Sequence, residues 1–295
     1  MSVTVVGPDE IQIAAAPRNR ALRRFVAQPA GVVALAYLIV LVLIAVAAPW
    51  ITPADPYAQD LGKILEPPGS LAWLGTDDLG RDVASRLIYG TQLSLLAAFE
   101  ATLIGVVLGV PLGVAAGFVG GRVDRAVMTI NDAVMSFPGL LLAIAVVAVL
   151  GPSLTNAMIA VGIVFAPRTL RLARGATLSV RHQTYVEASR SIGTSAPGIV
   201  RRHVLRNIRS PLLVESALLA GRAMLAEASL SFLGLGAQFP DASWGAMLGR
   251  SFEFIHRAPW QIVYPGMAIA LTVWAFNVFA DAARNSLGRE VRRAS

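Results

Sequence analysis

The sequence has no cysteine, a single lysine and few charged residues of any kind. Of its 295 residues, 15% are charged, whereas soluble globular domains usually carry about 25%. Without cysteine there is no disulfide framework, no thiolate nucleophile and no cysteine-based metal site. Because His182, His203 and His256 are scattered along the chain, we also expect no histidine metal centre.

The single lysine bears on nucleotide binding. Lys63 follows Gly62 but precedes Ile64, so the phosphate-binding loop G-x-x-x-x-G-K-[ST] is absent from this chain. That loop supplies the backbone cradle and the lysine that hold ATP phosphates. We therefore expect ATP and Mg²⁺ to be bound by another subunit, with no cofactor in this chain.

Apolar residues are abundant instead and come in long blocks. They make up 55% of the sequence, and six runs approach the roughly 20 residues that a helix needs to cross a bilayer. The runs cover residues 30–48, 93–118, 127–150, 154–172, 212–235 and 263–283. The sequence therefore predicts an all-α integral membrane protein with six transmembrane helices and the lipid bilayer as its surroundings.

The first apolar run follows a basic segment that contains Arg18, Arg20, Arg23 and Arg24. A basic flank before an apolar run is also typical of a secretory signal peptide. This run is longer than the roughly 7 to 15 residues of a signal-peptide core. We expect a membrane anchor that is retained.

Arginine is concentrated in the segments that a cytoplasmic N-terminus would place inside. That group comprises Arg18, Arg20, Arg23, Arg24, Arg122, Arg125, the arginines from Arg168 to Arg209, and Arg284, Arg289, Arg292 and Arg293. Few basic residues fall outside, namely Lys63, Arg81, Arg86, Arg250 and Arg257. Cytoplasmic loops of membrane proteins carry such an excess, so both termini are predicted to be cytoplasmic. The net charge of +7 follows from this topology and requires no nucleic-acid partner.

The six runs divide the chain into four parts. Residues 1–25 are predicted to form a cytoplasmic N-terminal tail, and residues 26–90 the first transmembrane helix and an external loop. Residues 91–285 hold the other five helices, interrupted on the inside by the loop 174–210. Residues 286–295 form a cytoplasmic C-terminal tail.

Four glycines recur at every fourth position of the second run. Gly105, Gly109, Gly113 and Gly117 share one face of a helix. Small residues at this spacing let helix backbones approach closely in lipid. Two interpretations stay open: packing within the chain, and contact with another subunit.

The long inside loop carries signals for a short helix. Thr184 followed by Glu187 is a capping-box pattern, in which both side chains satisfy backbone amides at a helix start. Gly193 suits a left-handed C-terminal stop, so a helix is predicted over 185–192. Because a helix of two turns is marginal in water, it must pack against this protein or a partner.

A second short helix is predicted to follow. Ser195 is a candidate N-cap, and the helix would run through Arg206 before the fifth span starts at Pro211.

The same loop carries a family motif. The pattern E-A-(A/S)-x-x-x-G, followed by a hydrophobic pair and Asn, resembles the "EAA" loop of ABC-importer permeases. The matching residues are Glu187, Ala188, Ser189, Gly193, Val204, Leu205 and Asn207. The resemblance implies a coupling helix that docks on an ATP-hydrolysing subunit through Tyr185, Glu187, Ala188, Ser189, Ile192 and Gly193. Arg206 departs from the family, which usually has proline there.

Longer motifs extend the resemblance over nearly the whole chain. They are LGTDDLGRDVASRLIYG, GVPLGVAAGFVGGRVD, DAVMSFPGLLLAI, LSFLGLG with SWGAML, and YPGMAIALTVWAFN. Together they resemble the second, C-type permease subunit of dipeptide, oligopeptide and nickel importers. The resemblance implies a non-enzymatic permease in the cell membrane that forms half of a peptide pathway. Its implied partners are a B-type permease, two ATP-binding subunits and an extracytoplasmic substrate-binding protein.

Two other functions stay open on the residues alone. An ion-coupled secondary transporter would place exchangeable carboxylates near the bilayer centre, and a non-transporting scaffold would need none. Charged residues within or beside the spans are candidates for the pathway or a gate, namely Glu100, Asp132, Arg222 and Glu227.

Arg222 lies deepest, about 17 Å from Pro211 along a helix axis. A charge there costs on the order of 3 kcal/mol on insertion scales and should face protein or water. Since Glu100 is expected at a similar depth, we predict that Arg222 and Glu100 pair or line the pathway together. Pairing with Glu227 or with the partner permease is the alternative.

Overall fold

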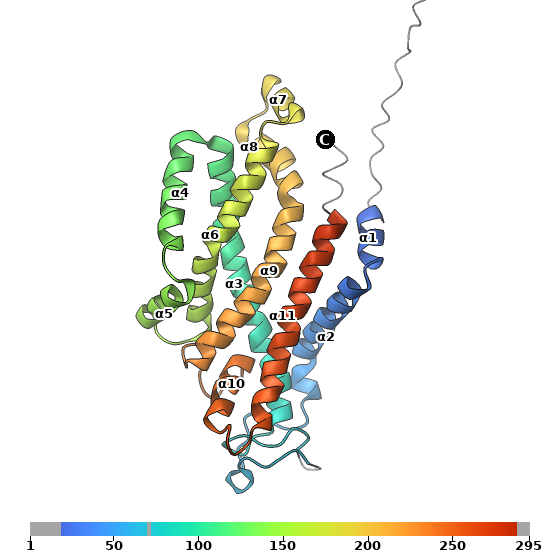
Figure 1. Ribbon diagram of the computed structural model, residues 1–295, viewed down its shortest axis with the longest axis vertical. Helices are drawn as coiled ribbons and strands as arrows, with labels where there is room; N and C mark the ends of the chain where they lie inside the picture. Colours follow the sequence, from blue (N-terminus) through green and yellow to red (C-terminus); the bar gives the residue numbers. More distant parts are fainter. Residues whose placement is uncertain (1–18, 70–71, 288–295) are drawn as a thin grey trace, which may run out of the picture.

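The computed structural model describes residues 19–69 and 72–287, and within them the regular elements are helical. In chain order they are α1 (Asn19–Val26), α2 (Pro29–Ile51), the 3-10 turn η1 (Leu61–Lys63), α3 (Val83–Val119), α4 (Gly121–Met135), α5 (Gly139–Leu150), α6 (Leu154–Val180), α7 (Thr184–Ser191), α8 (Ala196–Ile199), the π-helical turn η2 (Val200–Val204), α9 (Leu205–Phe232), α10 (Trp244–Glu253) and α11 (Trp260–Leu287). Figure 1 shows an elongated bundle with its long helices roughly side by side.

Four helices of the described chain, α2, α3, α6 and α11, are long and apolar enough to cross a membrane. The pair α4 and α5 would make a fifth span, but the two axes bend by 89°. The predicted run 127–150 is therefore divided between two helices that meet at a sharp bend, instead of forming one straight span. Pro138 is the reason, because proline disfavours helical geometry in the residue before it.

The fifth predicted run lies in α9, which is not among those candidate spans. Glu215, Arg222 and Glu227 fall within this helix and lower its mean hydropathy. Four to five spans is thus the number that helix length and composition support.

The loop between α6 and α9 is shorter than predicted. α6 continues to Val180, and helix resumes at Ala196, so α8, η2 and α9 run on without the predicted break at Arg206. Arg206, unlike proline, keeps a backbone N–H and fits a helix interior. Pro211 lies inside α9 rather than at its start; membrane helices tolerate internal proline because local adjustments satisfy the freed carbonyl.

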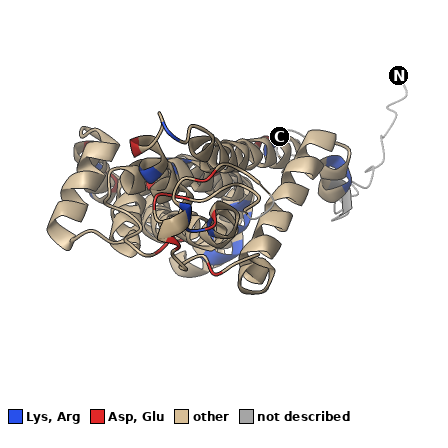
Figure 2. Ribbon diagram, turned by 90° about the horizontal axis from the view of Figure 1, so that it is seen from below, with Lys and Arg blue, Asp and Glu red and all other residues tan. Residues whose placement is uncertain are grey.

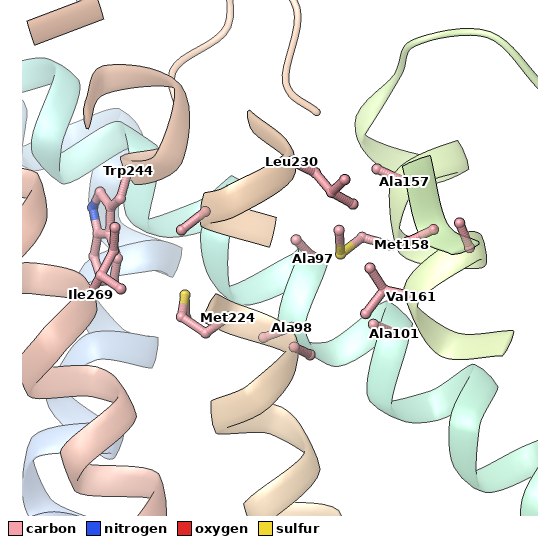
Figure 3. Packing of buried hydrophobic residues seen from close by; sticks show 14 of the residues in the cluster. Ala97, Ala98, Ala101, Ala157, Met158, Val161, Met224, Leu230, Trp244 and Ile269 are labelled. Atoms are coloured by element: carbon pink, nitrogen blue, oxygen red, sulfur yellow. The ribbon is translucent and has the colours of Figure 1, made fainter. Parts of the chain in front are cut away.

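Packing between α3 and α6 forms the centre of the bundle. A Cβ placed on Gly109 would lie 2.7 Å from the Ala166 carbonyl oxygen, and one on Gly117 would lie 2.8 Å from that of Arg174. The glycine face therefore brings α3 against the α6 backbone, which confirms packing within the chain. Figure 3 shows the small residues Ala97 and Ala101 of α3 close to Met158 and Val161 of α6.

The two ends of the bundle differ. α7 projects at one end, where α1 and the last turn of α11 also lie, while α10 and the loop before α3 lie at the other end (Figure 1). Part of the predicted tail 1–25 is thus helical, because α1 begins at Asn19. Residues 1–18 and 288–295, most of the two predicted tails, lie outside the described residues.

Candidate functional site

The start of α7 differs from the predicted capping box. Thr184 is already the first helical residue, and Gln183 in extended geometry is the N-cap, with no side-chain hydrogen bond. The Gln183 carbonyl accepts from the amides of Val186 (2.8 Å) and Glu187 (3.1 Å). Because Thr184 stands one position too late to cap, the capping-box prediction is wrong, although the predicted helix exists.

The end of α7 is a Schellman motif, as Gly193 predicts. Gly193 has φ +81°. Its amide donates to the Arg190 carbonyl (3.0 Å), and the Thr194 amide donates to that of Ser189 (3.1 Å). These two bonds satisfy carbonyls that the last turn would leave free. The left-handed stop at Gly193 is confirmed.

The inner face of α7 is tied to the start of the long helix that follows it. Val186 is fully buried. The Ser189 hydroxyl lies 2.9 Å from His203 Nε2, and the Asn207 amide donates to the Tyr185 hydroxyl at 3.0 Å. Burial raises the pKa of Tyr185 above its ordinary value. These contacts attach α7 to η2 and α9.

The outer face of α7 is uncovered in the chain alone. Glu187, Ala188 and Gly193 are exposed, and Ile192 is 82% exposed. Of the six predicted coupling residues, Ser189 alone faces mainly inward, toward His203.

α7 also reaches α3. The Arg190 guanidinium lies 5.9 Å from the centre of the Phe118 ring, within the range of a cation–π contact. Arg181, just before α7, donates to the Gly117 carbonyl at 2.9 Å. A displacement of α7 would thus act on the adjoining ends of both α3 and α9.

Arg222 has a different partner from the predicted one. Its Nη2 lies 2.5 Å from Glu215 Oε1 on the same helix, and Arg168 Nε of α6 lies 3.8 Å from that oxygen. Among the described residues Glu100 forms no ion pair or side-chain hydrogen bond, so the predicted Arg222–Glu100 pair is absent. Residues seven apart lie on one helix face two turns apart, a distance that two long side chains can bridge.

The other pathway candidates lie in separate places. Asp132 is exposed on α4 and pairs with Arg171 of α6 at 2.7 Å. Glu227 is fully buried under α10, where the Ser231 hydroxyl donates to its Oε1 at 2.7 Å. Glu100 is half-buried on α3. The structure thus brings together none of the four, and Glu215, Arg168 and Arg171 are charged neighbours that sequence reasoning missed.

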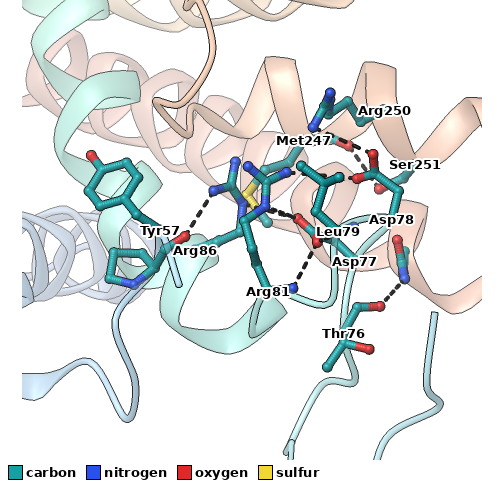
Figure 4. Close-up of polar contacts among 12 residues, drawn as sticks. Tyr57, Thr76, Asp77, Asp78, Leu79, Arg81, Arg86, Met247, Arg250 and Ser251 are labelled. Carbon is teal, nitrogen blue, oxygen red and sulfur yellow. Dashed lines mark hydrogen bonds and ion pairs between the residues drawn. The ribbon is translucent and has the colours of Figure 1, made fainter. Parts of the chain in front are cut away.

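A further cluster missed from sequence lies at the end of the bundle opposite α7. Arg81, 1% exposed, donates from Nε to Asp77 at 2.7 Å, and Arg86 lies 3.4 Å from the same carboxylate. Arg250 of α10 lies 3.5 Å from Asp78. Figure 4 shows these side chains joining the loop, α3 and α10, and Figure 2 views the bundle from this end. The motif GTDDLGRD therefore holds the loop to α3 and α10 through ion pairs.

Comparisons with known proteins give this geometry its context. Residues 109–293 match the family described as the binding-protein-dependent transport system inner membrane component. The chain belongs to this family. Residues 17–68 of this permease also match the N-terminal transmembrane domain of oligopeptide transport permease C.

Two relatives resemble the permease over most of its length. It is 44% identical over 292 residues to the glutathione transport system permease protein GsiD of Shigella flexneri serotype 5b (strain 8401), covering 99% of this chain and 95% of that protein. It is 42% identical over 259 residues to the probable D,D-dipeptide transport system permease protein DdpC of Escherichia coli (strain K12), covering 88% and 87%.

A solved structure shares the fold. An inward-facing form of the methionine ABC transporter MetNI matches with a TM-score of 0.57 at 20% identity, covering 71% of this chain and 96% of that one. At this identity the likeness concerns the fold alone.

Family membership decides among the three functions that the sequence left open. The chain is a multi-pass inner-membrane permease subunit of an ABC transport system, whose ATPase activity resides in partner subunits. The system also includes a binding protein. As a permease of this family, the chain carries no cofactor of its own. The ion-coupled transporter and the scaffold are set aside.

Proposed function

We propose that this permease forms half of the translocation pathway of an importer for short peptides, delivered by an extracytoplasmic binding protein. The peptide substrate is inferred from the match over 99% of the chain to a permease named for glutathione transport, together with the match to one named for D,D-dipeptides. Both names describe small peptides with free carboxylates.

In this proposal α7 is the coupling helix. Its inner face is fixed to α9 by the Tyr185–Asn207 and Ser189–His203 contacts, and its outer face presents Glu187 and Ile192. A rigid helix with one face free is what a groove on an ATP-binding subunit requires. Since α7 also touches α3 through Arg190, movement of that subunit would shift two pathway helices together.

We also propose six spans with both termini in the cytoplasm. The spans are α2, α3, the bent pair α4 and α5, α6, α9 and α11. α9 is about 42 Å long, which exceeds a hydrocarbon core of about 30 Å. Of the charged residues near its middle, Arg222 pairs with Glu215, which also lies near Arg168, and Glu227 is buried. Support for the orientation comes from α1, α7 and the last turn of α11 lying at one end.

The proposed assembly contains this chain, a homologous B-type permease and two ATP-binding subunits, with the binding protein at the end that carries α10. On its own, outside this assembly, the permease neither transports nor hydrolyses ATP.

The test is uptake of labelled dipeptides and longer peptides by cells with and without this chain. We expect uptake to be lost on deletion and restored by the plasmid-borne gene. Uptake that persists unchanged contradicts the peptide proposal, and ATP turnover by the purified chain alone contradicts the assembly.

A further inference from the structure

The inner half of α6 exposes polar residues where a lipid-facing helix would expose apolar ones. From Phe165 to Val180 the exposed residues are Arg168, Arg171, Gly175 and Ser179. Their spacing of three and four places them on one helix face. By contrast α2 exposes Val33, Val40 and Leu43. A lipid environment therefore suits α2 but not this face of α6.

The face lies beyond the middle of the span. Arg168 is about 21 Å along the axis from Leu154, in a bilayer core about 30 Å thick. Its side chain is 67% exposed, and that of Arg171 is 46% exposed. Charged side chains at such depth face protein or a water-filled cavity, because exposure to lipid is too costly.

The charges around this face do not cancel. Arg168 and Arg222 share the single carboxylate of Glu215, while Arg171 pairs with Asp132. Three guanidinium groups therefore meet two carboxylates, and one positive charge remains in excess. Glu215 is mostly buried, so the exposed part of the group is dominated by arginine.

From these observations we propose that Arg168 and Arg171 form the hydrated, electropositive lining at the cytoplasmic end of the pathway, with Gly175 and Ser179 continuing the same face to its inner opening. It attracts the carboxylates of anionic peptides as they pass toward the cytoplasm. The substrate class rests on the proposed peptide function, whereas the hydration and the sign of the potential do not.

The chain offers a direct probe of that potential because it has no native cysteine. Gly175 has open space around an added Cβ, so Gly175→Cys places a thiol on the face without a clash. In the assembled complex we measure its modification by anionic sulfonatoethyl and cationic trimethylammonium-ethyl methanethiosulfonates, following the mass of this chain at about 0.01 M salt, where screening is weak.

Arg168→Gln should lower the anionic-to-cationic rate ratio about fourfold. The arginine lies about 10 Å from position 175 along the axis, and in water one charge at that distance changes the two rates about twofold in opposite directions. Arg168→Lys, which keeps the charge, should retain the ratio. Lys63→Gln, which removes a charge from the distant external loop, should leave it unchanged.

Two results overturn the proposal. A thiol at position 175 that neither reagent modifies shows that lipid or the partner permease covers the face, and a ratio that Arg168→Gln leaves unchanged shows that its potential is not set there. In proteoliposomes, Arg168→Gln should also reduce uptake of a peptide with a free carboxyl terminus relative to its amide. Absence of any peptide uptake by the native complex contradicts the peptide function alone. The thiol modification rates still test whether this face is hydrated and electropositive.

Discussion

Replacing Gly193 by valine tests whether the shape of α7 is what couples the permease to its ATPase. Gly193 holds φ +81° and has no atom within 4 Å of an added Cβ. A side chain therefore meets no clash, and the change acts through backbone strain. A left-handed conformation costs a non-glycine residue roughly 1–2 kcal/mol, and a β-branched residue lies at the upper end.

That cost is large for an element of eight residues. Each 1.4 kcal/mol is about a tenfold change in an equilibrium constant, so Gly193→Val should lower the ratio of closed to open Schellman turn by roughly ten- to thirtyfold. We expect normal membrane insertion, faster hydrogen exchange of the Gly193 and Thr194 amides, and reduced ATPase retention and uptake.

Asparagine supplies the matched control, because it tolerates the left-handed region better than other residues. Gly193→Asn should stay close to the native protein, with Gly193→Ala between it and Gly193→Val. Equal ATPase retention in all four proteins would refute the reasoning.

Three further predictions follow from the contacts. Glu187→Arg should leave α7 helical, since Glu187 caps nothing, but should weaken binding of the ATPase in a pull-down; unchanged binding would remove Glu187 from the interface. Arg222→Leu should destabilise the permease by roughly 1–3 kcal/mol, because Glu215 then keeps only Arg168, 3.8 Å away, and adding Glu215→Leu should recover part of the melting temperature; no recovery would show that the pair is not coupled. Burial and Asp241 raise the pKa of Tyr57 to about 12 from 10.0, so the loop between α2 and α3 should lose stability as pH rises through that window, and Asp241→Asn should lower the midpoint in an ultraviolet titration.

Apolar length predicted most of the fold because the cost of exposing polar backbone in lipid leaves helices as the spanning element. The length of an apolar run does not show whether the helix within it bends, so the break at Pro138 follows from the proline itself. Gly109 and Gly193 were predictable because close approach and positive φ each favour a single residue type.

The pairing of Arg222 was not predictable from depth. Depth along a helix gives one coordinate, and Glu100 and Arg222 can share it while lying on different sides of the bundle. Glu215 carried an available signal, because it stands two turns from Arg222 on the same face. The contact between Arg250 and Asp78 joins residues far apart in the sequence, so no local pattern indicated it.

The most direct measurement is ATP-driven uptake of a labelled dipeptide by proteoliposomes that contain the permease pair, the ATP-binding subunits and the binding protein. Complexes with native chain and with Gly193→Val would be compared at equal permease content. The account predicts ATP-dependent uptake by the native complex and a large loss with the variant while the chain remains inserted. Uptake that is equal in both, or that proceeds in complexes assembled without this chain, would contradict it.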